Sequence, residues 1–142
     1  MPADTTTTLV ATETADGIQL HGLLIQPIAS SLTPAIIWIP GFGANFYFAP
    51  HLRLGQALAA QGSAVIVANT RGHDFGVMLD PKAGSPYLAG AAWERLEESP
   101  LDLAGWIAFA LHYGFAGTVL AGHSLGAVKV IAYQAQRQDE HV

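Results

Sequence analysis

The five residues Gly122-His123-Ser124-Leu125-Gly126 have the pattern G-x-S-x-G and lie between an apolar run and a segment of helical periodicity. The run is residues 118–121, and the helical segment extends to about Arg137. A serine at a sharp turn from a strand into a helix is held in strained backbone geometry, and small neighbours make that turn possible. The pentapeptide therefore predicts a strand–turn–helix unit with the Ser124 hydroxyl exposed at the turn.

Apolar runs and helical segments alternate from residue 35 onward. The apolar runs are continuous, which suits strands buried on both faces of a parallel sheet. The expected elements are strands at 35–39, 64–68 and 118–121 and helices at about 52–59, 99–112 and 125–137. This alternation predicts an α/β fold, with a mostly parallel sheet and helices on both faces.

Turn signals bound several of these elements. Leu9 to Thr14 and Ile18 to Gln26 read as two antiparallel strands joined at Asp16-Gly17, which predicts an N-terminal hairpin. Ser99-Pro100-Leu101-Asp102 predicts a helix start, with Ser99 as the capping residue. The connection from Asn69 to about Glu98 is too long for a simple turn, so we expect a substrate-facing loop or a short helix there.

Length and composition limit the class of protein. The 142 residues form one domain at most, here 1–142, and an apolar content of 51% supports a core. The net charge of −5 and the six unclustered basic residues argue against a nucleic acid or an anionic membrane as partner. A small organic molecule fits better. The chain has no cysteine, so thiolate catalysis and disulfides are excluded.

Two segments bear on the cellular location. Met1-Pro2-Ala3-Asp4 and the four threonines after it have no basic region and no apolar segment, so we expect no signal peptide and a cytoplasmic protein. Residues 103–122 are almost all apolar, but Gly114 and Gly117 interrupt them. A buried helix followed by a buried strand therefore explains this segment better than a membrane span.

A serine that attacks a carbonyl needs donors for the oxyanion that forms. The Leu125 amide is the first candidate, because it begins the helix after Ser124. The second is the Phe42 amide, in the glycine turn Gly41-Phe42-Gly43 that follows the first buried strand. The alternative for this turn is a plain chain reversal. A dinucleotide site is disfavoured, because Phe46 stands where the fingerprint needs glycine or alanine, and no cofactor is expected.

The acid and the base of a serine hydrolase have no clear candidates. Asp139, Glu140 and His141 follow about fifteen residues of helix, which at about 1.5 Å each places them more than ~20 Å from the hydroxyl. His123 is expected to point sideways from the turn, as a structural residue or as one that lines the pocket. His73 and Asp74 are also candidates for lining it, but adjacent residues suit a triad poorly, and residues 71–74 are expected to anchor a loop. No spacing resembles a metal site.

Together, the pentapeptide, the glycine turn and the loop Asn69-Thr70-Arg71-Gly72-His73-Asp74 resemble the α/β-hydrolase superfamily. The resemblance covers nearly the whole chain, but only as the N-terminal half of that fold. It implies Ser124 as the nucleophile, with an acid and a histidine on loops after later strands. On this resemblance the chain is expected to be truncated after the helix that follows Ser124.

Four short strings are similar to an esterase-like branch that includes fungal hydrolases of siderophore esters. They are Asn45-Phe46-Tyr47, Arg71-Gly72-His73-Asp74, Gly90-Ala91-Ala92-Trp93-Glu94 and Ala127-Val128-Lys129. The leading hypothesis is a serine hydrolase of carboxylic esters that forms an acyl-enzyme on Ser124. The alternative is a non-catalytic small-molecule-binding protein or an inactive fragment of this fold. The strand before Ser124 is expected at an open sheet edge, where the chain could associate with itself.

Overall fold

The computed structural model describes residues 4–29, 33–79, 81 and 84–142. Residues 1–3, from the segment that we expect not to be a signal peptide, and residues 80, 82 and 83 of the long connection lie outside this range. A five-stranded sheet has the strand order β1-β2-β4-β3-β7. Its strands are β1 (Thr5–Glu13), β2 (Gln19–Pro27), β4 (Val65–Ala68), β3 (Ala35–Ile39) and β7 (Thr118–Gly122).

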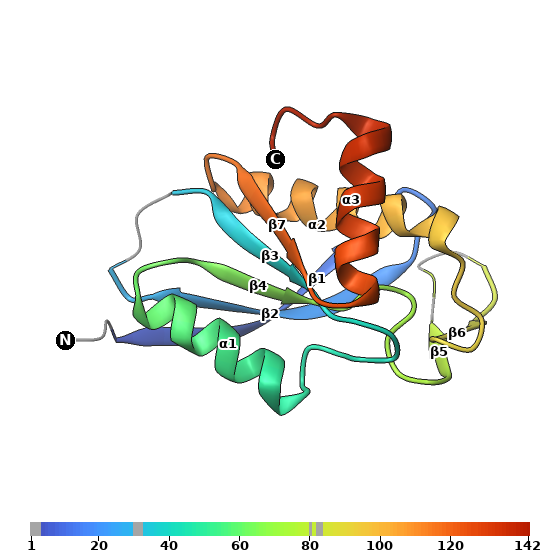
Figure 1. Cartoon of the computed structure of the whole chain (residues 1–142). Helices are drawn as coiled ribbons and strands as arrows, with labels where there is room; N and C mark the ends of the chain where they lie inside the picture. Colours follow the sequence, from blue (N-terminus) through green and yellow to red (C-terminus); the bar gives the residue numbers. More distant parts are fainter. Residues whose placement is uncertain (1–3, 30–32, 80, 82–83) are drawn as a thin grey trace.

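The sheet combines the predicted hairpin with a parallel half. β1 pairs antiparallel with β2, β2 pairs antiparallel with β4, and β3 pairs parallel with both β4 and β7. Helix α1 (Ala49–Ala60) covers one face, while α2 (Ser99–Tyr113) and α3 (Leu125–Arg137) cover the other (Figure 1). Two apolar clusters fill the space under these helices, one on each side of the sheet. The predicted α/β class, with helices on both faces, is confirmed.

Several element boundaries differ from the expected ones. β1 begins at Thr5 rather than Leu9, because the exposed threonines pair with the end of β2. Threonine suits a strand at a solvent-facing edge. The expected cap at Ser99 is wrong: Ser99 is already helical, and its hydroxyl donates to the Leu96 carbonyl at 2.7 Å. Pro100 does lie in the first turn of α2, as its fixed φ favours.

The long connection after β4 carries a small hairpin of its own. β5 (Val77–Leu79) pairs antiparallel with β6 (Tyr87–Ala89), and a 3₁₀ turn at Leu96–Glu98 leads into α2. The expectation of a loop or a short helix therefore missed two strands, since three-residue strands leave too short a pattern to recognise. Residues 103–122 form most of α2, the turn at 114–117 and all of β7, which is the predicted helix followed by a strand. No helix within the described ranges is long and apolar enough to cross a membrane.

Arg71 holds the start of this connection in place. Its side chain is 4% exposed, and its guanidinium binds Asp102 of α2 at 2.8 Å and Asp16 of the β1–β2 turn at 2.8 Å. Burial opposes the charge of Arg71, but the two carboxylates outweigh it and raise the pKa of the guanidinium. The Arg71 backbone N–H also donates to Asp102. Residues 71–74 thus anchor a loop, as predicted.

Candidate active site

Ser124 lies between the last residue of β7 and the first residue of α3, and it is exposed. Its backbone has φ 54° and ψ −123°, a region that residues other than glycine rarely adopt. A residue held there costs about 1–3 kcal/mol, which the surrounding structure must offset. The predicted strained strand-to-helix turn is therefore present at this serine.

Three glycines make this turn sterically possible. A Cβ added at Gly126 would lie 2.1 Å from the Ile39 carbonyl oxygen, and one at Gly122 would lie 2.5 Å from the Gly126 carbonyl carbon. A Cβ added at Gly41 would lie 3.1 Å from the Ser124 Cβ. The glycine turn after β3 and the turn after β7 are thus packed directly against each other, with Ser124 at their contact.

Backbone N–H groups gather around this contact. At the start of α3, the Gly126 N–H donates to the His123 carbonyl oxygen at 2.9 Å, and the Ala127 N–H donates to the Ser124 carbonyl oxygen at 3.0 Å. Leu125, between Ser124 and Gly126, has no acceptor assigned to its N–H within the part of the chain that the structure describes. A free N–H at a helix start favours negative charge. Phe42, next to Gly41 in the facing turn, likewise has no acceptor assigned to its N–H among the residues described.

The loop that carries Phe42 is fastened to Asp74. The Asp74 carboxylate accepts hydrogen bonds from the Asn45 side chain at 2.6 Å and from the Tyr47 hydroxyl at 2.7 Å. His73 lies 2.7 Å from the same carboxylate, and Gly43 bridges to the His73 backbone. Burial alone would raise the pKa of Asp74, but these hydrogen bonds lower it. An ionised Asp74 therefore holds the turn at residues 41–43 beside Ser124.

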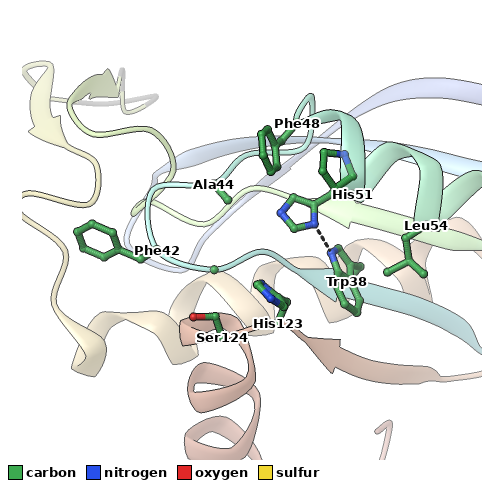
Figure 2. A pocket seen from close by; sticks show the side chains of 10 residues that line it. Trp38, Phe42, Ala44, Phe48, His51, Leu54, His123 and Ser124 are labelled. Atoms are coloured by element: carbon green, nitrogen blue, oxygen red, sulfur yellow. Dashed lines mark hydrogen bonds between the residues drawn. The ribbon is translucent and has the colours of Figure 1, made fainter.

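A cavity of about 620 Å³ opens beside Ser124 (Figure 2). Its lining is mostly apolar and comes from β3, the loop after it, the start of α1 and the turn before α3. The lining residues are Trp38, Gly41, Phe42, Ala44, Phe48, Pro50, His51, Leu54, His123 and Ser124. This volume and character suit a small organic molecule.

His51 is the buried polar residue of this lining. It is 7% exposed, and its Nδ1 accepts a hydrogen bond from the Trp38 indole N–H at 3.1 Å. Burial lowers the pKa of His51, and the nearby His123 lowers it further. His51 was not predicted from the sequence, because nothing in its surroundings along the chain sets it apart from other histidines such as His21 and His112.

The predicted site residues separate into two groups. Gly41, Phe42, His123 and Ser124 line the cavity together, and Leu125 follows Ser124 directly. Gly43 lines a smaller adjoining pocket with Phe42 and Ala44. His73 and Asp74 are absent from the cavity lining, contrary to the expectation, because they bind each other and the loop at residues 45–47.

The three ionisable residues near the end of the chain lie away from Ser124, as the helix length predicted. The His141 carbonyl accepts from the Thr118 N–H at 2.7 Å, and Asp139 binds Tyr133. Thr118 is the first residue of β7, whereas Ser124 follows the last, so these contacts are at the opposite end of the strand. In the described ranges, no group of three His, Asp or Glu residues is placed to hold a metal ion.

Comparison with known proteins bears on the fold. No family model matches the chain, and no curated protein matches it. Several solved structures do match the chain. The chain is similar to GrgF, an α/β hydrolase from Penicillium sp. sh18, with a TM-score of 0.72 and 18% identity over 94% of this chain and 43% of that one.

Two esterases give the same result. Est1E from Butyrivibrio proteoclasticus, in a structure with ferulic acid bound, has a TM-score of 0.71 at 23% identity over 92% of this chain and 49% of that one. The Pyrococcus furiosus esterase Pf2001 has a TM-score of 0.71 at 17% identity over 96% and 49%. The chain therefore spans about half the length of the structures it matches, and its fold is part of an α/β-hydrolase fold.

Proposed function

We propose that this chain carries the nucleophile of a serine hydrolase that acts on carboxylic esters. The observation that carries the proposal is the strained backbone of Ser124, exposed at the turn from β7 into α3 and packed against Gly41. Similarity to esterases supports an ester as the substrate. The cytoplasmic location and the narrower likeness to hydrolases of siderophore esters stay predictions.

In the proposed reaction, the Ser124 oxygen attacks the ester carbonyl carbon and its proton passes to a general base. The carbonyl oxygen becomes an oxyanion, and the N–H groups of Phe42 and Leu125 donate to it. The alcohol then leaves with a proton, and water hydrolyses the acyl-enzyme to release the acid and restore Ser124. Loss of one oxyanion donor typically costs about 10²–10³ in rate.

No described residue is assigned as the acid or the base. Of the described histidines, His123 and His51 line the cavity with Ser124, but the Nδ1 lone pair of His51 is already engaged by Trp38. His73 is paired with Asp74 outside the cavity lining. This arrangement favours a second candidate, a non-catalytic protein that binds a small molecule in the same cavity.

A fluorophosphonate probe separates the two candidates, because it reacts with an activated serine and not with an ordinary hydroxyl. The 142 residues alone are expected to be inactive, because none of those described is assigned as the acid or the base. We expect covalent labelling of a version that also carries the acid and the histidine implied by the resemblance, and loss of labelling in its Ser124→Ala variant. Ser63→Ala, which changes a serine in the turn before β4, is the matched control and should label like the unaltered protein. Labelling that persists in Ser124→Ala contradicts the proposed nucleophile, and no labelling of the version that carries the acid and the histidine favours the binding candidate.

A further inference from the structure

The hydrogen bond between Trp38 and His51 fixes the position of the imidazole proton. An indole nitrogen can only donate, so the His51 Nδ1 that lies 3.1 Å from it must present a lone pair. In a neutral ring the proton is then on Nε2. His51 is therefore a hydrogen-bond donor toward its surroundings, and it has no second lone pair with which to act as a base for Ser124.

The Nε2–H group faces an apolar space. Figure 2 shows this nitrogen turned away from Trp38, on the side of the cavity where Ala44 and Phe48 lie. The Phe48 ring centroid is 5.5 Å from that of His51. No acceptor for Nε2–H is assigned anywhere in the described ranges, although only 7% of the residue is exposed. Nε2 is not among the fully buried polar atoms that lack a partner, so it is open to water in the cavity, and a ligand oxygen that replaces this water would accept from it.

The rest of the lining leaves few polar alternatives. His123 and Ser124 are at the mouth of the cavity beside the turn, and both are exposed. The His123 and His51 rings are 6.2 Å apart, so the two histidines mark different positions along the wall. The half-buried Trp38 and Leu54 and the exposed Phe48 present ring and alkyl surface to the cavity. His51 therefore supplies the polar contact inside an otherwise hydrophobic wall.

We propose that the cavity prefers ligands with an aromatic or alkyl group that carries one acceptor oxygen. This oxygen accepts a hydrogen bond from the His51 Nε2–H. For substrates, this preference rests on the proposed function: it restricts them to esters in which the group that enters the cavity carries one such oxygen. The binding preference itself can be tested without any catalysis.

Acetophenone and α-methylstyrene form a matched pair of probes, because they have nearly the same shape and differ in a carbonyl oxygen against a methylene group. Binding of each would be measured by tryptophan fluorescence and by saturation-transfer NMR. The measurements would use Ser124→Ala, so that no adduct forms with the serine. We expect acetophenone to bind about three- to tenfold more tightly, as one added hydrogen bond implies.

Two variants at position 51 test whether His51 causes the preference for acetophenone. His51→Phe, in the Ser124→Ala background, removes the donor and should abolish the preference, whereas His51→Gln places an amide N–H near the former Nε2 and should retain part of it. Equal binding of the two probes before any change at position 51 overturns the proposal. So does a preference that persists in His51→Phe, since the oxygen would then be held elsewhere, for instance by the N–H groups of Phe42 and Leu125.

The outcome is separable from the test of the proposed function. If the fluorophosphonate fails to label Ser124 in the test above but acetophenone is preferred in a His51-dependent way, the cavity is a selective binding site and the proposed hydrolase is contradicted. If Ser124 is labelled but the preference is absent, the hydrolase is supported and the role of His51 is contradicted.

Discussion

The Cα of Gly126 faces the Ile39 carbonyl so closely that a methyl group there would lie 2.1 Å from the oxygen. This contact joins the first turn of α3 to the end of β3, and backbone atoms make it on both sides. A backbone carbonyl cannot swing aside as a flexible side chain can. The spacing between the Ser124 turn and the neighbouring strand therefore depends on the absence of a side chain at position 126.

Gly126→Ala should destabilise the protein by about 1–3 kcal/mol or more, the usual range for overpacking in a dense region. The measurement is the free energy of unfolding from urea denaturation. Gly117→Ala is the matched control, because its added Cβ would meet the His141 carbonyl oxygen at an ordinary 3.5 Å. Equal stability of the two variants contradicts the tight contact.

Ser124→Gly should be at least as stable as the unaltered protein, by up to about 1–2 kcal/mol, because glycine adopts φ 54° without the Cβ clash. The greater chain entropy of unfolded glycine offsets part of this gain. Ser124→Ala keeps the Cβ and should leave stability unchanged. Thermal unfolding of the three proteins provides the comparison, and a glycine variant less stable than the alanine variant rules out the strain.

The sheet and the three long helices followed from the sequence because their signals are local and repeated. Residues 35–39 and 125–137 have the predicted bounds, since an unbroken apolar run or a sustained helical stripe leaves little choice. The hairpin β5–β6 escaped prediction because strands of three residues depend on contacts with the loop at residues 71–75. One such contact is the Gly90 N–H to the Arg71 carbonyl at 2.9 Å.

The site was predictable only in part. The glycine pattern located Ser124 and its neighbouring turn, because the close backbone approach requires those glycines. The role of His51 was out of reach, since it depends on Trp38 from another element, thirteen residues earlier. The expectation that Asp74 lines the cavity failed for the same reason: its partners Asn45 and Tyr47 belong to a loop distant in sequence.

His51 should make the protein sensitive to mild acid. Its pKa is lowered in the folded state, so between that value and the unfolded pKa of about 6.5 the unfolded chain binds more protons. The stability from neutral His51 is complete above about pH 6.5 and is lost as the pH falls through the folded pKa. His51→Gln does not titrate, so its unfolding free energy should fall less between pH 7 and pH 5. If the unfolding free energies of the two proteins fall equally between pH 7 and pH 5, the lowered pKa of His51 is contradicted.

Lys129 should be essential to folding stability. Its ammonium group is buried, 1% exposed, and binds Glu94 and the Thr70 hydroxyl, the latter at 2.8 Å. Lys129→Met leaves the buried Glu94 charge without its partner and should cost about 3–5 kcal/mol. Adding Glu94→Gln removes that charge and should recover part of the loss. A urea-denaturation cycle measures the coupling, and additive effects of the two changes contradict it.

β7 should promote association of the chain with itself. It pairs with β3 on one side and has no strand on the other within the described ranges, and Val119 is 51% exposed. Val119→Lys places a charge on this edge strand, which discourages pairing between copies. Sedimentation velocity over a range of concentrations should show association that weakens in the variant. A monomer at all concentrations before the change contradicts the prediction.

Arg71 joins segments that are far apart along the chain: Asp16 is 55 residues before it and Asp102 is 31 residues after it. Neither local helix formation nor closure of the N-terminal hairpin brings these carboxylates together. The guanidinium acquires both partners only when the hairpin turn and α2 have reached their final places, so its burial marks the completion of assembly. Folding intermediates in which either segment is still undocked would leave this cation in water.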